Sequence, residues 1–149
     1  MHKRLGTCAL LWLISTGCSD DFHSAGFLER VDTSLPNNRS AVALGLGDLD
    51  GDQRQDVAVA NSQNELNVFI SKGDGSFATG IAYPLDQGAN SRLVAVADLS
   101  GEGRADVLVA NDNLNTLSLF WNQGAGTLQS AGAAISAGCR PRALALADA

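Results

Sequence analysis

The chain returns to the same acidic position every fifty residues. The aspartates that mark this position are Asp48, Asp98 and Asp148, and each follows a run in which small residues alternate with Val or Leu. A unit that recurs at a fixed spacing indicates a repeat architecture, in which neighbouring units bury one another's apolar faces. The sequence therefore predicts stacked repeats.

The local pattern inside each unit has a period of two. Aliphatic and small residues alternate along short runs that end at Gly, Asn or Asp, and this pattern is typical of β-strands. In the first unit we expect strands at residues 41–47, 56–60, 65–71 and 78–84. Four strands in about 50 residues make a unit the size of one propeller blade. We therefore predict an all-β fold made of β-propeller blades.

The repeats also divide the chain. Residues 40–90 form the first repeat and residues 91–140 the second, while residues 141–149 supply only the first strand of a third. Propellers typically close with about 4–8 blades, so two complete four-stranded blades and one strand make a partial propeller. We expect this chain to be the N-terminal part of a longer protein or the product of a truncated reading frame. Assembly of a propeller from several copies is a less favoured alternative.

An acidic loop follows the first expected strand. Carboxylates at alternate positions repel one another unless a cation gathers them, and Ca²⁺ takes about 6–8 oxygen ligands at flexible angles. Gly51 permits the sharp turn that such a loop needs. We predict a calcium site whose ligands are Asp48, Asp50, Asp52, the backbone carbonyl of Arg54, and Asp56.

Two alternatives for this loop stay open. An EF-hand needs Glu at its position 12 and flanking helices. Val59 stands at that position here, and expected strands flank the loop. The other alternative is an acidic surface turn that binds no metal.

The matching loop of the second repeat is a poorer site. Ser100 replaces a carboxylate with a neutral hydroxyl, and Glu102 is longer by one methylene than the residue expected there. Fewer ligand charges lower the affinity for Ca²⁺. The ligands predicted for this weaker site are Asp98, Ser100, Glu102, the carbonyl of Arg104, and Asp106. Asp148 belongs to a third, incomplete site.

These features together resemble the FG-GAP-like repeat, also called the VCBS repeat. The resemblance rests on the acidic loop from Asp48, the strand at residues 56–61 and the glycine turn at residues 73–77, and it extends over residues 40–149. Such repeats are the units of integrin-alpha-type β-propellers. The resemblance implies antiparallel four-stranded blades, calcium in the loop between the first two strands, and further blades as partners in a longer chain.

The N-terminus has the composition of an export signal. Basic residues precede an apolar stretch at residues 5–16 that is shorter than the roughly 20 residues of a membrane-spanning helix. We expect residues 1–17 to be a signal peptide and residues 18–39 a polar tether; a buried N-terminal helix is the alternative. Gly17-Cys18 resembles the lipobox of bacterial lipoproteins, which implies lipidation of Cys18 and an outer-membrane location. Ser15 departs from that pattern, so plain secretion stays open.

Composition limits the functions of the chain. A net charge of -6 argues against nucleic acid as a partner. After removal of the signal only His23 is left as a histidine, and no Gly-x-Ser-x-Gly elbow occurs, so we predict no catalytic site in this chain. We expect a calcium-binding scaffold for protein or glycan binding outside the cell. The alternative is the propeller module of a secreted polysaccharide-active enzyme, with membrane contact only through the lipid anchor.

Overall fold

The computed structural model describes residue 35 and residues 39–146, in which every regular element is a β-strand. Within this part of the chain no helix is long and apolar enough to pass through a membrane. The proposed signal peptide, the lipidation site Cys18, almost all of the tether, and Asp148 lie outside the described residues.

The first sheet, blade 1, has its strands in chain order. β1 (Ala41–Gly47), β2 (Asp56–Asn61), β3 (Glu65–Phe69) and β4 (Ile81–Pro84) pair antiparallel, each with the next. All six residues of β2 are buried, because this strand lies inside the sheet and both of its faces are covered. The predicted four-stranded antiparallel blade is confirmed here.

The second sheet, blade 2, repeats this arrangement and adds a strand. β5 (Ser91–Ala97), β6 (Asp106–Asn111), β7 (Thr116–Gly124) and β8 (Thr127–Ser130) pair in order, and β9 (Ile135–Ser136) also pairs with β7. The second blade therefore has five strands where four were predicted. Residues 131–134 interrupt its edge strand, and Gly132 turns the chain there with a φ of 84°.

The edge of blade 1 is divided in the same way. The strand predicted at 65–71 ends at Phe69, and the one predicted at 78–84 begins at Ile81. Between them Ser71 and Phe77 form a single bridge, which occupies the position of the Asn122–Leu128 pair in blade 2. The division is thus a property of the repeat and not of one blade.

Residues 141–146, predicted to begin a third blade, form no strand. The first strand of each blade pairs only with the second, as β1 does with β2 and β5 with β6. Residues 147–149 lie outside the described part of the chain, so the start of a third repeat at residues 141–149 stays a prediction.

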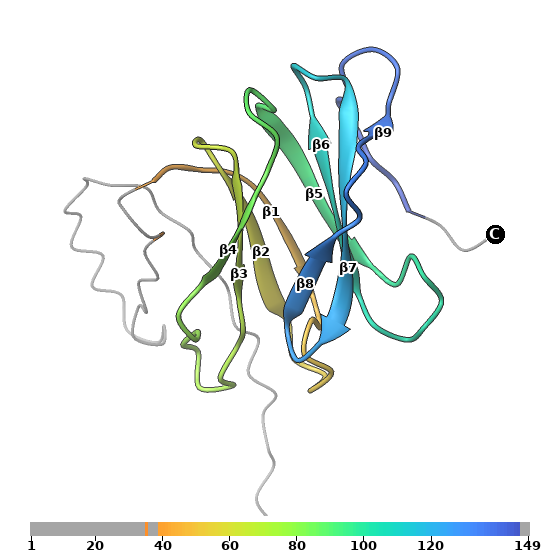
Figure 1. The fold of residues 1–149 in the computed structure, drawn as a ribbon. Coiled ribbons are helices and arrows are strands. Elements are labelled where there is room, and N and C mark those ends of the chain that lie inside the picture. The colour runs from red at the N-terminus through yellow and green to blue at the C-terminus, as the bar shows by residue number, and fades with distance from the viewer. Residues whose placement is uncertain (1–34, 36–38, 147–149) are drawn as a thin grey trace, which may run out of the picture.

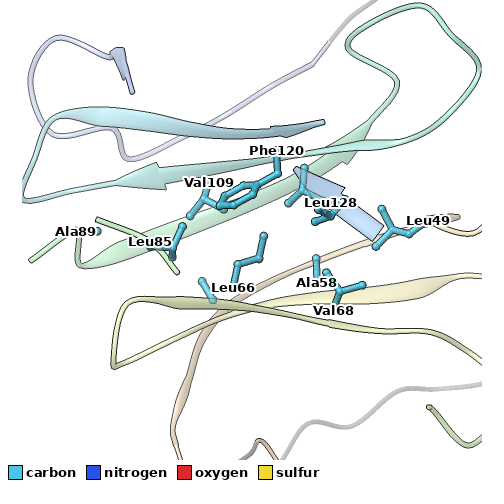
Figure 2. Packing of buried hydrophobic residues seen from close by; sticks show 11 residues of the cluster. Leu49, Ala58, Leu66, Val68, Leu85, Ala89, Val109, Phe120 and Leu128 are labelled. Atoms are coloured by element: carbon cyan, nitrogen blue, oxygen red, sulfur yellow. The ribbon is translucent and has the colours of Figure 1, made fainter. Parts of the chain in front are cut away.

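The two blades pack face to face, with β1 beside β5 (Figure 1). Buried side chains from both sheets fill the space between them, among them Leu66 and Val68 from blade 1 and Phe120 and Leu128 from blade 2 (Figure 2). A smaller cluster of Leu35, Val57, Val59 and Phe69 lies on the opposite face of blade 1. The result is an open, partial propeller.

Candidate metal site

The first acidic loop connects β1 to β2. Gly47, which ends β1, pairs with Asp56, which begins β2, so the loop begins and ends at one point of the sheet. Three of its carboxylates converge there: one oxygen from each of Asp48, Asp50 and Asp56 lies within 4.8 Å of the other two. Three hard oxygen donors at this spacing match the ligand chemistry of Ca²⁺.

Asp48 organises the turn of the loop. Its Oδ1 accepts a hydrogen bond from Gly51 N at 2.6 Å, and its Oδ2 accepts one from Gln53 N at 2.7 Å. Both donors have left-handed backbone angles, with φ of 89° and 68°, which curl the chain around the carboxylate. Burial opposes ionisation of Asp48, but the backbone donors, led by Gln53, outweigh it and lower the pKa of its carboxyl group.

Asp56 fixes the loop to the sheet. Its side chain is buried, and it accepts hydrogen bonds from Leu49 N at 2.7 Å and from Ser71 N at 2.8 Å. Burial raises the pKa of this carboxyl group despite the two backbone donors, and the charges of Asp50 and Asp52 add to the rise. A cation placed among these carboxylates would favour the ionised form of Asp56.

Asp52 is not part of the cluster formed by the other three carboxylates. It forms an ion pair with Arg54 and accepts a hydrogen bond from Arg54 N at 2.8 Å. The guanidinium group of Arg54 also donates to Ser71 O at 3.3 Å, which holds the end of the loop against the chain after β3. The structure thus gathers three of the four predicted carboxylates and pairs the fourth with an arginine. Coordination by the Arg54 carbonyl stays a prediction.

The second loop has the same backbone arrangement. Asp98 accepts hydrogen bonds from Gly103 N and Gly101 N, both at 2.7 Å, and Gly103 is the main reason that the pKa of Asp98 is lowered. Asp106 is buried and accepts from Leu99 N at 3.1 Å and Asn122 N at 2.9 Å. The loop is therefore built as the first one is.

The polar side chains of the second loop have different partners from those of the first loop. Ser100 Oγ donates to Asp98 Oδ1 at 3.3 Å, and Glu102 pairs with Arg104. Arg104 Nε in turn donates to Asn122 O at 3.1 Å. Within the described residues, no third carboxylate joins Asp98 and Asp106. These residues fit a calcium ion less well than those of the first loop.

Residues 48–109 match the family model of the FG-GAP-like repeat. Over this segment the chain is similar to that family. The match runs from the first residue of the first acidic loop to Val109 in β6, so it spans the boundary between the two predicted repeats and includes both loops. It confirms the family resemblance for these residues. No curated protein matches the chain at a significant level.

The first loop of the FG-GAP-like segment also contacts the second blade. Leu49 O accepts hydrogen bonds from Asn122 Nδ2 at 2.9 Å and from Gly126 N at 3.0 Å, while the Leu49 side chain enters the core between the blades. These contacts of Leu49, Asn122 and Gly126 were not predicted from the sequence. Ser71 and Asn122 occupy equivalent positions in the two repeats, 51 residues apart. A polar residue at the same position of both repeats is the sequence signal that could have identified them.

Proposed function

We propose that this protein is a calcium-binding, non-catalytic β-propeller module that acts outside the cell or at the cell surface as a scaffold. The observation that supports a metal role best is the convergence of Asp48, Asp50 and Asp56 in the first loop. Ca²⁺ is the favoured ion because it accepts carboxylate, carbonyl and water oxygens at irregular angles. An extracellular site needs a Kd of only about 10⁻⁴ to 10⁻³ M to be filled.

The proposed role of the ion is structural. The first loop is held between blade 1, through Asp56 and Ser71, and blade 2, through the carbonyl of Leu49. An ion bound among its carboxylates would offset their repulsion and keep Leu49 in the shared core. Binding to the folded state alone stabilises a protein by about 2.7 kcal/mol at a ligand concentration of 100 Kd.

Thermal melting with Ca²⁺ and with a chelator tests this proposal. We expect Ca²⁺ to raise the Tm of the full chain, and Asp50→Ala to reduce that rise to the smaller contribution of the second loop. Asp50 is the best residue to change, because its carboxylate accepts only one hydrogen bond in the loop, from Asp52 N at 3.1 Å. Asp86→Ala is the matched control, since it removes the same charge outside both loops.

Calorimetric titration with Ca²⁺ should show one stronger site, which Asp50→Ala removes, and a weaker one in the second loop. Equal melting temperatures of the unaltered chain in Ca²⁺ and in chelator would contradict a structural metal.

For the scaffold role we favour protein contact over glycan binding. Sugars usually stack on exposed aromatic faces, whereas Phe69 and Phe120 are buried in the two apolar clusters. The described residues also contain no histidine, which supports a non-catalytic role for this part of the chain. A glycan array and a pull-down from extracellular protein would distinguish the two partner classes.

We also propose that residues 1–17 direct export of the chain. Cys18 is then either lipidated, which anchors the chain to the membrane, or unmodified in a secreted chain. Radiolabelled palmitate in cells that express the unaltered chain or Cys18→Ser separates the two routes.

A further inference from the structure

Leu35 occupies a place on the outer face of blade 1, the face turned away from blade 2, that matches the place of Leu85 between the blades. The two leucines are 50 residues apart, and each comes six residues before the first strand of a blade. Leu85 is 6% exposed in the core between the blades, and Leu35 is 8% exposed in the smaller cluster. Each leucine thus packs on the blade that follows it in the chain.

The residues that share a cluster with each leucine also correspond. Both sets come from the second and third strands of a blade, and in both the first valine pairs across the sheet with the phenylalanine. They are Val107, Val109 and Phe120 in the cluster of Leu85 (Figure 2), and Val57, Val59 and Phe69 in the cluster of Leu35. The outer face of blade 1 is therefore covered as the inner face of blade 2 is.

The sequence before Leu35 continues the correspondence. In blade 1 the chain reaches Leu85 directly from β4, the fourth strand. Residues 27–34 lie outside the described part of the chain, but their apolar positions repeat those of that strand 50 residues earlier. The apolar residues that keep this spacing are Phe27, Val31 and Leu35, against Phe77, Ile81 and Leu85.

Asn67 gives an independent sign that a polar segment lies on this face. It pairs with a member of the smaller cluster, so its side chain lies on the outer face of blade 1. The side chain is fully buried, and among the described residues neither Nδ2 nor Oδ1 has a hydrogen-bond partner, although buried amides normally have one. Its counterpart Ser118 lines a pocket with Pro84 and Leu85. By the same correspondence, Asn67 would lie beside Ser34, whose hydroxyl group supplies a partner.

Two leucines of β1 mark the part of this face that stays open. Leu44 and Leu46 pair with valines of the smaller cluster and are 44% and 46% exposed. Their counterparts in β5, Val94 and Val96, are half-buried against the glycines of β1. A fourth strand alone covers the equivalents of β2 and β3, and only the first strand of the same blade would cover Leu44 and Leu46.

We propose that residues 27–35 are the fourth strand of a further blade, and that this strand docks on the outer face of blade 1 as β4 docks on blade 2. The partner that completes the further blade is a three-stranded sheet of the same repeat type, distinct from the strands of blades 1 and 2. Its first strand would pack on Leu44 and Leu46. The proposed tether is then shortened to residues 18–26.

Thermal melting of the full chain in chelator tests the docking apart from any effect of calcium. We expect Val31→Ala and Leu35→Ala each to lower the Tm by at least about 5 °C, because each leaves a cavity against blade 1. Leu28→Ala is the matched control. In a strand Leu28 points away from the face that Leu35 uses, so the Tm should fall by no more than about 3 °C.

A gain of stability provides a second measurement. Between the blades, Tyr83 Oη accepts the N–H of Leu128. Thr33 is the counterpart of Tyr83, and Phe77 is that of Leu128. Thr33→Tyr should therefore add the same contact on the outer face and give a higher Tm than Ser34→Tyr, which places its ring on the other side of the strand.

Three results would overturn the proposal. An equal fall in Tm for Leu28→Ala and Leu35→Ala would exclude a strand with one face on blade 1. No effect of Val31→Ala would confine the docking to Leu35, and equal melting temperatures of the two tyrosine variants would exclude the proposed register. Circular dichroism confirms that each variant is folded. If Leu35→Ala fails to fold, Leu35→Val reduces the same contact more mildly.

Discussion

Asn122 joins three segments of the chain through one side chain. Its Nδ2 donates to Leu49 O at 2.9 Å and to Ala105 O at 2.8 Å, and its Oδ1 accepts from Gly124 N at 2.8 Å. Leu49 belongs to the acidic loop of blade 1, while Ala105 and Gly124 belong to blade 2. A single amide group therefore ties the first loop to the neighbouring blade, at a place where the side chain is only 3% exposed.

Asn122→Ala should lower the free energy of unfolding by about 1–3 kcal/mol, because Ala105 O loses a buried partner and Leu49 O keeps only Gly126 N. Urea denaturation of the full chain measures the change. Gln123→Ala serves as the control at the neighbouring exposed position, where a substitution should change stability by no more than about 0.5 kcal/mol. Equal stability of the two variants would show that the Asn122 amide contributes nothing to the docking of the loop.

At the scale of the elements, β1 and β5 approach each other closely because β1 has glycines where β5 has alanines. A Cβ atom on Gly47 would lie 2.3 Å from Val96 Cγ1, and one on Gly45 would lie 3.0 Å from the side chains of Val94 and Val96. Gly47 is needed here for space and not for its backbone angle, because its φ is not positive and a Cβ atom would clash with Val96. The spacing of the two blades is set by these two residues.

Gly47→Ala should destabilise the chain by about 1–3 kcal/mol, the usual cost of overpacking a filled core. Adding Val96→Ala to this variant should restore part of the loss, because the methyl group then occupies the volume that the valine leaves. A double-mutant cycle from the four melting curves gives the coupling energy of the two positions. Additive effects would mean that Gly47 matters for its backbone freedom and not for the contact with Val96.

The sequence predicted the strands that the alternating pattern defines, and their positions are nearly right: β1 covers the predicted residues and β2 is longer by one. Period-two patterning depends on burial of alternate residues, so it works best inside a sheet. It failed at the edges, where the fourth strand of each blade is broken by a turn, as at Gly132. The sequence also placed Asp48, Asp50 and Asp56 in one loop, but it could not show that Asp52 pairs with Arg54 and lies outside their cluster.

On the scale of the whole molecule, the two blades share one apolar core. The cluster between them contains residues of β2, β3, β6, β7 and β8, and one hydrogen bond from the Leu128 N–H to Tyr83 Oη, at 2.9 Å, crosses the same contact. Neither sheet could bury these side chains alone, so we expect the blades to unfold together. Two probes, intrinsic fluorescence and far-UV circular dichroism, should then give coincident urea transitions.

Tyr83→Phe tests how the blades are held without altering the core. The phenyl ring keeps the edge-to-face contact with Phe120, whose ring centre lies 6.1 Å away, and only the acceptor of the Leu128 N–H is lost. We expect a loss of about 1 kcal/mol with the two transitions still coincident, since the apolar contact dominates. Ser130→Ala, which removes an exposed acceptor of the Gly132 N–H, should cost less. Separate transitions in the Tyr83→Phe variant would mean that this one polar bond, and not the shared core, makes the two blades cooperative.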